Sequence, residues 1–291
     1  MSNRFVSLTV ALTIVWLFTP CARAQRGGAQ ASWQSAVVYD KKGEKPAAAA
    51  PTRDISGIWV PAEGPQAGVR ADGAAAMPSD GKPEHELPYT PLGRGTFLAH
   101  KPVGGVTRVS APRSNDYAPG CDPQGFPRIV LYDFRTGRII QTPNSVVILY
   151  DANNKWRMIW TDGRQLPDLK GNPEPTWWGY SVGKWVDDYT FVANSNGFDE
   201  RTWLDNAGRP HSDALNVTEE YKRTDHDHLV LTVTIDDPKM YTKPWIAMKL
   251  SLRLQPPGFN LEERQCSMAE YQRFMGTAVP RTNKPSGPLA H

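Results

Sequence analysis

The sequence predicts a mainly β protein, built as an antiparallel β-barrel or a closed bent sheet with a C-terminal helix. From residue 127 onward, short runs alternate β-branched or aromatic residues with polar ones at period two. The connections between these runs are short and contain Asn, Asp or Gly, as antiparallel hairpins require. No long helical pattern separates the runs, so a parallel sheet built from βαβ units is not expected.

About nine segments carry the strand pattern, which favours a barrel over an open sheet. They span residues 128–132, 137–142, 145–151, 155–161, 178–185, 189–195, 214–223, 228–236 and 243–255. A helical pattern follows at 260–275, where the apolar residues are spaced for one helix face: Leu261, Met268, Tyr271 and Met275.

The first 24 residues have the features of a secretory signal peptide. Arg4 precedes an apolar run from Phe5 to Phe18, and Ala22-Arg23-Ala24 forms a small-x-small cleavage site. The apolar run is too short for a retained membrane anchor, so no membrane span is expected after the signal is removed. We therefore expect a periplasmic or secreted protein.

Composition divides the rest of the chain. Residues 25–52 are rich in Ala, Gly and Lys and predict a flexible linker. A single barrel-like domain is expected over 53–276, with a flexible tail at 277–291. Within the domain, residues 61–127 carry many Pro and Gly residues and predict a long irregular segment.

The charge and the cysteines limit the possible partners and compartments. The formal net charge is only +3, from 33 basic and 30 acidic residues, so no nucleic-acid partner is expected. Cys21 leaves with the signal peptide, and Cys121 and Cys266 are expected to form a disulfide in an oxidising compartment. Two separate buried thiols remain the alternative, because sequence does not give the Cα separation that a disulfide needs.

Residues 179–183 read GYSVG and match the G-x-S-x-G motif of many esterases and lipases. That motif holds a nucleophile only where a strand ends at the serine and a helix begins directly behind it. Here Ser181 is followed by strand-forming residues and by the turn pair Asp187-Asp188. The segment therefore predicts a hairpin, with Ser181 as a small strand residue between two glycines.

The stretch 194–223 concentrates polar and aromatic residues in one loop and the strand after it. His211 is the candidate general acid or base, because its ordinary pKa lies near working pH. Asp199 or Asp205 could orient this imidazole. In the competing interpretation the loop is only a turn, with the side chains of His211 and Ser212 bonded to the backbone.

The same region could instead form a ligand-binding site at the mouth of the barrel. The candidate ligand-binding residues are aromatic or cationic: Trp178, Trp203, Tyr221, Arg164 and Arg128. Large aromatics also fill barrel cores, so both interpretations of the tryptophans stay open. His226 and His228 lack a third ligand at a suitable spacing, and no metal or other cofactor is predicted.

Two resemblances support the β fold. The run SGIWV at 56–60 resembles the G-x-W that opens the first strand of lipocalin-like (calycin) barrels, with Gly57 and Trp59 in the matching places. Residues 54–266 are similar to an uncharacterised family of secreted proteins of soil and sphingomonad-type bacteria. The matching stretches are DISGIW, CDPQGFPR, QTPNSVVILY, WTDGR, WWGYSVGKW, GFDERTWLDNAGRPHS and DDPKMYTKPW. The second resemblance implies an exported β protein and no particular reaction.

Two main functions follow as hypotheses. The first is a secreted or periplasmic barrel that binds a small apolar or aromatic molecule near Trp178, Trp203 and His211. The alternative is an enzyme (a lyase, isomerase or hydrolase) that uses His211 and a nearby aspartate as an acid–base pair. A weaker third hypothesis makes residues 61–127 a protein-contact surface.

Overall fold

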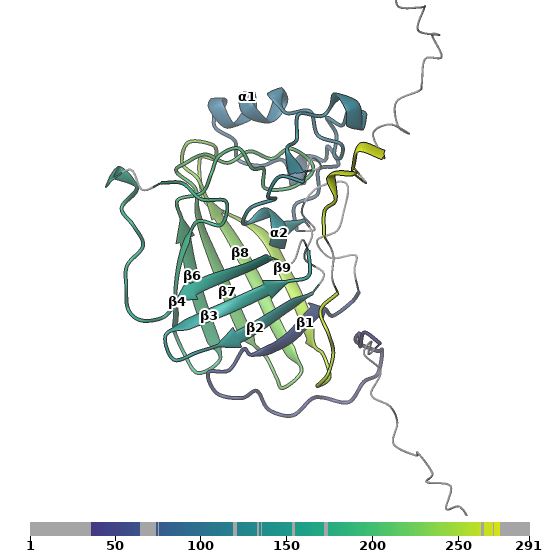
Figure 1. Ribbon diagram of the computed structural model, residues 1–291, viewed down its shortest axis with the longest axis vertical. Helices are drawn as coiled ribbons and strands as arrows, with labels where there is room; N and C mark the ends of the chain where they lie inside the picture. The colour runs from purple at the N-terminus through teal and green to yellow at the C-terminus, as the bar shows by residue number, and fades with distance from the viewer. Residues whose placement is uncertain are drawn as a thin grey trace, which may run out of the picture. The chain divides into compact units, whose positions relative to one another are not determined.

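The computed structural model describes residues 36–64, 74, 76–118, 121–132, 134, 136–152, 155–171, 174–262, 265–269 and 271–273. Within them the chain forms a closed barrel of strands in sequence order (Figure 1). The strands are β1 (Gly57–Pro61), β2 (Gly137–Gln141), β3 (Ser145–Tyr150), β4 (Lys155–Trp160), β5 (Tyr180–Trp185), β6 (Thr190–Asn196), β7 (Asn216–Arg223), β8 (His228–Asp236) and β9 (Trp245–Leu254). The helices are α1 (Pro91–Ala99) and α2 (Arg128–Leu131), with 3-10 turns at Pro83–His85, Ala111–Arg113 and Leu169–Gly171. The predicted mainly β barrel is confirmed.

The strands pair antiparallel around the barrel with one exception. β1 closes the ring against β9, beginning at Trp59↔Leu254. β4 and β5 instead run parallel and pair at Trp160↔Val182 alone. Residues 161–179 form the long connection that a parallel return requires. The expectation of purely antiparallel pairing is therefore wrong at this one seam, and the barrel wall is weakly joined there.

Side chains fill the barrel interior. Residues that point inward from different strands, such as Trp59, Phe191 and Leu231, are almost completely buried. A cavity in this interior, bordered by Trp59 and Leu231, has a volume of about 10 Å³, which is the size of a single water molecule. A barrel of this strand number has an interior that side chains can occupy fully. This cavity is therefore too small for an organic ligand.

The first strand is the one that the G-x-W pattern predicted. Gly57 has a φ of +137°, and a Cβ at this position would overlap the side chain of Leu254 on β9. Trp59 is fully buried, and its indole Nε1 donates a hydrogen bond of 3.0 Å to the Ile55 carbonyl. Glycine is thus favoured here by the positive φ, while the indole anchors the strand in the core.

The segment 128–132 was predicted as a strand and is a helix. All four residues of α2 are buried, including Arg128, whereas a half-buried strand would bury alternate residues. The amides of Val130 and Leu131 both donate to the Pro127 carbonyl, which begins the turn. Tertiary packing thus overrides the β propensity of Ile129 and Val130.

Part of the irregular segment 61–127 is also helical. Thr90 caps α1 by accepting a 3.0 Å hydrogen bond from the Gly93 amide, and Pro91 occupies the first helical position. In Figure 1, α1 and its connections lie across the upper end of the barrel. A Cβ on Gly93 would overlap the Met240 carbonyl, so glycine lets the helix lie directly on the β8–β9 loop.

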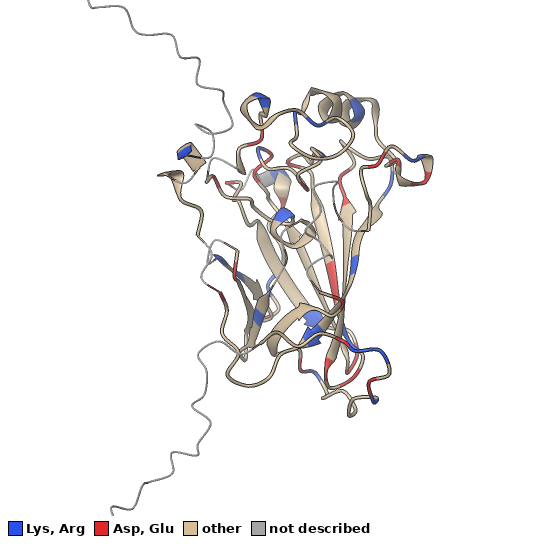
Figure 2. Ribbon diagram, turned by 90° about the vertical axis from the view of Figure 1, so that its right-hand side faces the viewer, with Lys and Arg blue, Asp and Glu red and all other residues tan. Residues whose placement is uncertain are grey.

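The described part of the predicted flexible linker makes specific contacts with the barrel. Val38 and Gln255 exchange two hydrogen bonds of 2.8 and 2.9 Å. Arg253 on β9 binds Glu44 and Asp40 of the same segment. Figure 2 shows basic and acidic residues side by side at this lower end of the barrel. These contacts hold residues 36–52 against the barrel, which their composition did not predict.

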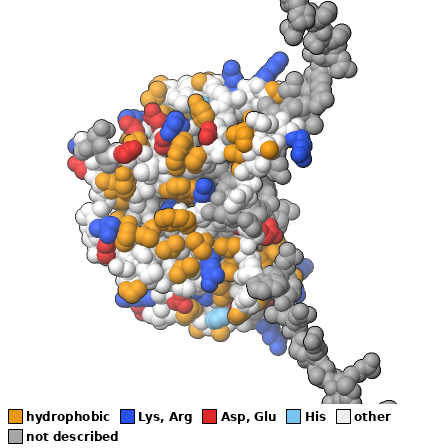
Figure 3. All heavy atoms as spheres, in the orientation of Figure 1, with side chains coloured by type: hydrophobic (Ala, Val, Ile, Leu, Met, Phe, Trp, Pro, Cys, Tyr) orange, Lys and Arg blue, Asp and Glu red, His pale blue; other side chains and the backbone are white. Residues whose placement is uncertain are grey.

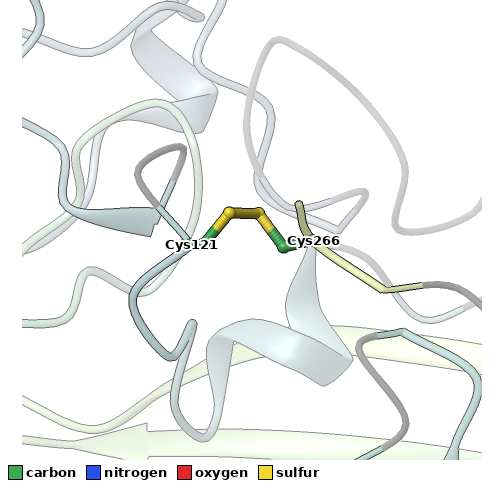
Figure 4. Close-up of a disulfide and its surroundings, with 2 residues drawn as sticks. All are labelled: Cys121 and Cys266. Atoms are coloured by element: carbon green, nitrogen blue, oxygen red, sulfur yellow. A yellow bond between two sulfur atoms is a disulfide. The ribbon is translucent and has the colours of Figure 1, made fainter. Parts of the chain in front are cut away.

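The predicted disulfide is present between Cys121 and Cys266, whose Cα atoms lie 5.4 Å apart (Figure 4). It joins the loop before α2 to the chain just before the C-terminal helix. That helix begins later than the pattern at 260–275 predicted, because helical residues begin only at Met268. The predicted signal peptide and the predicted flexible tail at 277–291 lie outside the described residues. Within the described residues, no helix is both long and apolar enough to cross a membrane.

Candidate functional site

A large pocket lies at the seam between β4 and β5, and we call it the seam pocket. Its volume is about 790 Å³, which is in the range of small-molecule sites. Because β4 and β5 pair at a single position, residues from both faces of the barrel wall border the gap. The lining residues are Lys155, Trp156, Arg157, Met158, Trp160, Arg164, Gln165, Leu166, Pro167, Trp178, Gly179, Tyr180, Ser181 and Val182.

Aromatic side chains form much of the wall of the seam pocket. Trp160 and Tyr180 come from the two strands that diverge, and Trp178 lies parallel to Tyr150 with ring centroids 6.2 Å apart. Trp156 is 60 % exposed. Figure 3 shows hydrophobic side chains gathered on the face where β2, β3 and β4 lie in front. The pocket therefore opens beside an exposed apolar surface, which is unusual unless a partner or ligand covers it.

Arg164 borders the same pocket from the connection between β4 and β5. Its guanidinium lies over the Trp160 ring at 3.7 Å from the centroid. Asp162 holds the guanidinium through hydrogen bonds from Nε at 3.0 Å and from Nη2 at 2.6 Å. The hydrogen bonds that the Arg164 side chain donates to Asp162 lower the pKa of the Asp162 carboxyl. Arg164 is thus an already paired cation with one face stacked on an indole.

Arg157 extends from β4 into the barrel and is the most buried of the charged residues that line the pocket. Its Nη2 is ion-paired with Glu219 on β7, and its guanidinium lies 3.8 Å from the centroid of the Phe126 ring. Glu219 also accepts a 2.7 Å hydrogen bond from the Tyr221 hydroxyl. Burial by itself lowers the pKa of Arg157, but the nearby Glu219 carboxylate outweighs it and the net shift is upward. Arg157 is therefore a permanent cation.

Ser181 is a wall residue and not a nucleophile at a strained turn. It lies inside β5, whose hairpin with β6 pairs Ser181 with Ser195. The two hydroxyl oxygens are 2.8 Å apart and both are buried. No helix begins behind Ser181, since residues 181–185 continue β5. The hairpin prediction is confirmed, and the elbow geometry of a serine hydrolase is missing from this segment.

The predicted acid–base pair at His211 is not formed. His211 is 3 % exposed; its Nε2 lies 2.7 Å from the Thr202 hydroxyl and its Nδ1 lies 3.2 Å from the Ser212 carbonyl. Burial lowers the pKa of His211. Asp199 is instead held by Arg201, with hydrogen bonds of 2.9 and 2.6 Å. Both nitrogens of the His211 imidazole are therefore hydrogen-bonded to residues of the same loop.

Asp205 is a structural carboxylate. It is fully buried and ion-paired with Arg209, four residues later. Its oxygens also accept hydrogen bonds from the amides of Ala207 at 2.9 Å and Ala74 at 3.1 Å. A carboxylate with this many donors fixes loop geometry and has no direct contact with the seam pocket.

The predicted ligand residues divide into two groups. Trp178 and Arg164 line the seam pocket. Trp203 is buried against His100 with ring centroids 4.4 Å apart, and Arg128 binds Asp116 through hydrogen bonds of 2.8 and 2.7 Å. Tyr221 borders the small interior cavity instead. The structure thus does not bring Trp178, Trp203 and His211 to one mouth, because Trp203 and His211 are buried within the 197–215 loop.

Sequence reasoning missed Arg157 and Glu219 as site residues. The alternation of buried and exposed residues along each strand contains a signal that could have identified them. Arg157 has the parity of buried Ile159, and Glu219 has the parity of buried Val217. A charged residue at an inward strand position is costly unless it is paired, so two such residues of opposite sign indicate a buried pair.

His226 and His228 bind carboxylates of their own end of the barrel. His226 Nδ1 lies 2.6 Å from Asp227, and His228 contacts Asp225 at 2.8 Å and Asp40 at 3.0 Å. Within the described ranges, no three His, Cys, Asp or Glu residues are grouped so that they could hold a metal ion.

No protein-family model and no curated protein matches this chain. Any functional conclusion therefore depends on the geometry of the seam pocket and its surroundings.

Proposed function

We propose that this protein binds a small apolar or aromatic molecule in the seam pocket. The observation that carries the proposal is a pocket of about 790 Å³ lined by Trp156, Trp160, Trp178 and Tyr180. Indole and phenol rings offer a large contact area to a flat ligand. The pocket also adjoins the apolar outer face of β2 to β4, where Ile140 and Trp156 are exposed.

An exported protein fits this proposal. The Cys121–Cys266 disulfide is typical of an oxidising compartment such as the periplasm or the cell exterior. The expected signal peptide and the resemblance to a secreted bacterial family support the same location. N-terminal sequencing of protein from a periplasmic extract tests it, and the expected mature N-terminus is Gln25.

Binding can be tested with the fluorophore N-phenyl-1-naphthylamine, a neutral aromatic probe. We expect saturable binding to the wild type. Trp156→Ala should weaken it about three- to tenfold, because an aromatic contact contributes about 0.5–1.5 kcal/mol. Trp156 is mostly exposed, so this variant should fold normally. Tyr189→Ala removes an exposed aromatic outside the pocket and is the matched control. Absence of saturable binding, or equal loss in both variants, contradicts the proposal.

A further inference from the structure

Arg157 differs from the other cations of the seam pocket in its burial and in its unused donors. Its side chain is 2 % exposed and its Nη2 is bound to Glu219. Its Nε and Nη1 are also buried, yet neither has a hydrogen-bond partner among the described residues. A guanidinium has only donors, and buried donors without acceptors are costly and rare in native proteins. Arg157 is therefore prepared for an acceptor that the protein itself does not supply.

Tyr150 adds a second unused polar group in the same part of the barrel. Its hydroxyl is buried without a hydrogen-bond partner among the described residues. Its ring stacks on Trp178, which lines the seam pocket. Burial raises the pKa of Tyr150, although the Arg157 charge partly offsets the effect. The phenol thus stays protonated beside the cation.

The charge of the pocket wall favours a negative ligand. The described residues that line it include Lys155, Arg157 and Arg164 and no Asp or Glu. Arg164 is paired with Asp162 and Arg157 with Glu219. Lys155, at the start of β4, forms no ion pair with any described residue. The wall therefore retains a positive charge after its internal ion pairs are counted.

We propose that the ligand of the seam pocket is an aromatic or other apolar carboxylate, whose carboxylate group accepts hydrogen bonds from Arg157. This inference rests on the proposed binding function and specifies its ligand class. A carboxylate has only acceptors when ionised, and hydrogen bonds between two charged groups are the strong ones. Its apolar body then contacts Trp160, Trp178 and Tyr180.

A pair of nearly isosteric ligands tests the proposal on the wild-type protein. Naphthalene-1-acetate and naphthalene-1-acetamide share the ring and differ in the charge of the polar group. We expect calorimetric titration at neutral pH to give at least tenfold tighter binding of the acetate. Equal affinities overturn the carboxylate assignment while leaving the proposed binding function standing. Binding of neither compound, together with no binding of N-phenyl-1-naphthylamine, overturns both proposals.

The variant Arg157→Lys assigns the effect to one side chain. It keeps a positive charge for Glu219 but removes the Nε and Nη1 donors. We expect the preference for the acetate to fall at least fivefold, with acetamide affinity within about twofold of the wild type. Arg138→Gln removes an exposed cation of β2 outside the pocket and should keep the full preference. A preference retained in Arg157→Lys overturns the role of Arg157. If that variant does not fold, the acetate–acetamide comparison on the wild type still decides the ligand class.

Discussion

Arg157 of β4 and Glu219 of β7 form an ion pair across the barrel interior, with side chains only 2 % and 0 % exposed. The pair joins two strands that are not neighbours in the sheet. Taking two charges out of water costs several kcal/mol for each ion, and the pair is tolerated because each charge neutralises the other. The Tyr221 hydroxyl completes the pair by donating to Glu219 at 2.7 Å.

Removing one member of this pair should strongly destabilise the fold. We expect Glu219→Gln to lower the free energy of unfolding by about 3–5 kcal/mol, because the Arg157 charge is left buried without its counter-ion. Urea unfolding followed by tryptophan fluorescence measures the loss. The neighbouring Glu220 is exposed on the same strand, so Glu220→Gln should change stability by less than about 0.5 kcal/mol. Similar losses in both variants would contradict the importance of the buried pair.

The Cys121–Cys266 disulfide should contribute to stability without being needed for barrel closure. It closes a loop of large sequence separation, 145 residues, and joins segments outside the strands. We expect the double variant Cys121→Ser, Cys266→Ser to lose about 2–5 kcal/mol of unfolding free energy. Far-ultraviolet circular dichroism should remain that of the wild type. A variant that has lost its β spectrum at room temperature would show that the bond is required for the fold.

His228 should make stability fall as pH rises above neutrality. Burial by itself lowers the pKa of His228, but hydrogen bonds to Asp40 and Asp225 outweigh it, and the net shift from 6.5 is upward. Arg253 also lies beside the ring, with Nη1 3.3 Å from its Nε2. A histidine whose pKa is raised by folding stabilises the folded state fully below about pH 6.5, the ordinary value. This stabilisation is lost as the pH rises through the folded-state pKa.

This contribution can be isolated as a difference between two proteins. The urea midpoint of wild type minus that of His228→Gln should be largest near about pH 6 and shrink toward about pH 9. His211 has a lowered pKa and acts in the opposite sense below about pH 6.5, but it is present in both proteins and cancels. A difference that grows with pH would contradict the sign of the His228 shift.

Ser181 should be unreactive toward serine-hydrolase probes. Its hydroxyl is buried against the Ser195 hydroxyl at 2.8 Å and it lies within a continuous strand. We expect no labelling by a fluorophosphonate and a cost of about 1–3 kcal/mol for Ser181→Ala, because the Ser195 hydroxyl loses its partner. Ser251→Ala, on the exposed side of β9, should cost much less. Stoichiometric labelling at Ser181 would contradict this prediction and would show that Ser181 is a reactive nucleophile.

The alternation of strand residues made most of the barrel predictable. The run at 228–236 matches β8 residue for residue. The run at 145–151 extends one residue beyond β3, and β9 lies within the predicted run at 243–255. α2 was missed because its β-branched residues are buried on all sides, and no local signal distinguishes that from a core strand. α1 was missed although Thr90 and Pro91 form a recognisable helix start.

The candidate site was harder to predict for a physical reason. Trp178 and Arg164 were found because aromatic and cationic residues gather near them in sequence. Arg157 and Glu219 are 62 residues apart, and their pairing depends on which strands face each other across the closed ring. Residues such as His211 and Asp205 have the chemistry of a site but use their hydrogen bonds to hold their own loop in place.

The single β4–β5 pairing leaves two facing strand edges in a barrel whose other neighbouring strands, among the described residues, are paired at several positions. Along that gap, backbone amides and carbonyls of both strands lie beside the seam pocket in addition to its side chains. Because few hydrogen bonds join β4 to β5, we expect these two strands to separate at a lower energetic cost than the other neighbouring strands. We therefore expect a ligand of the seam pocket to enter through the wall of the barrel, between β4 and β5.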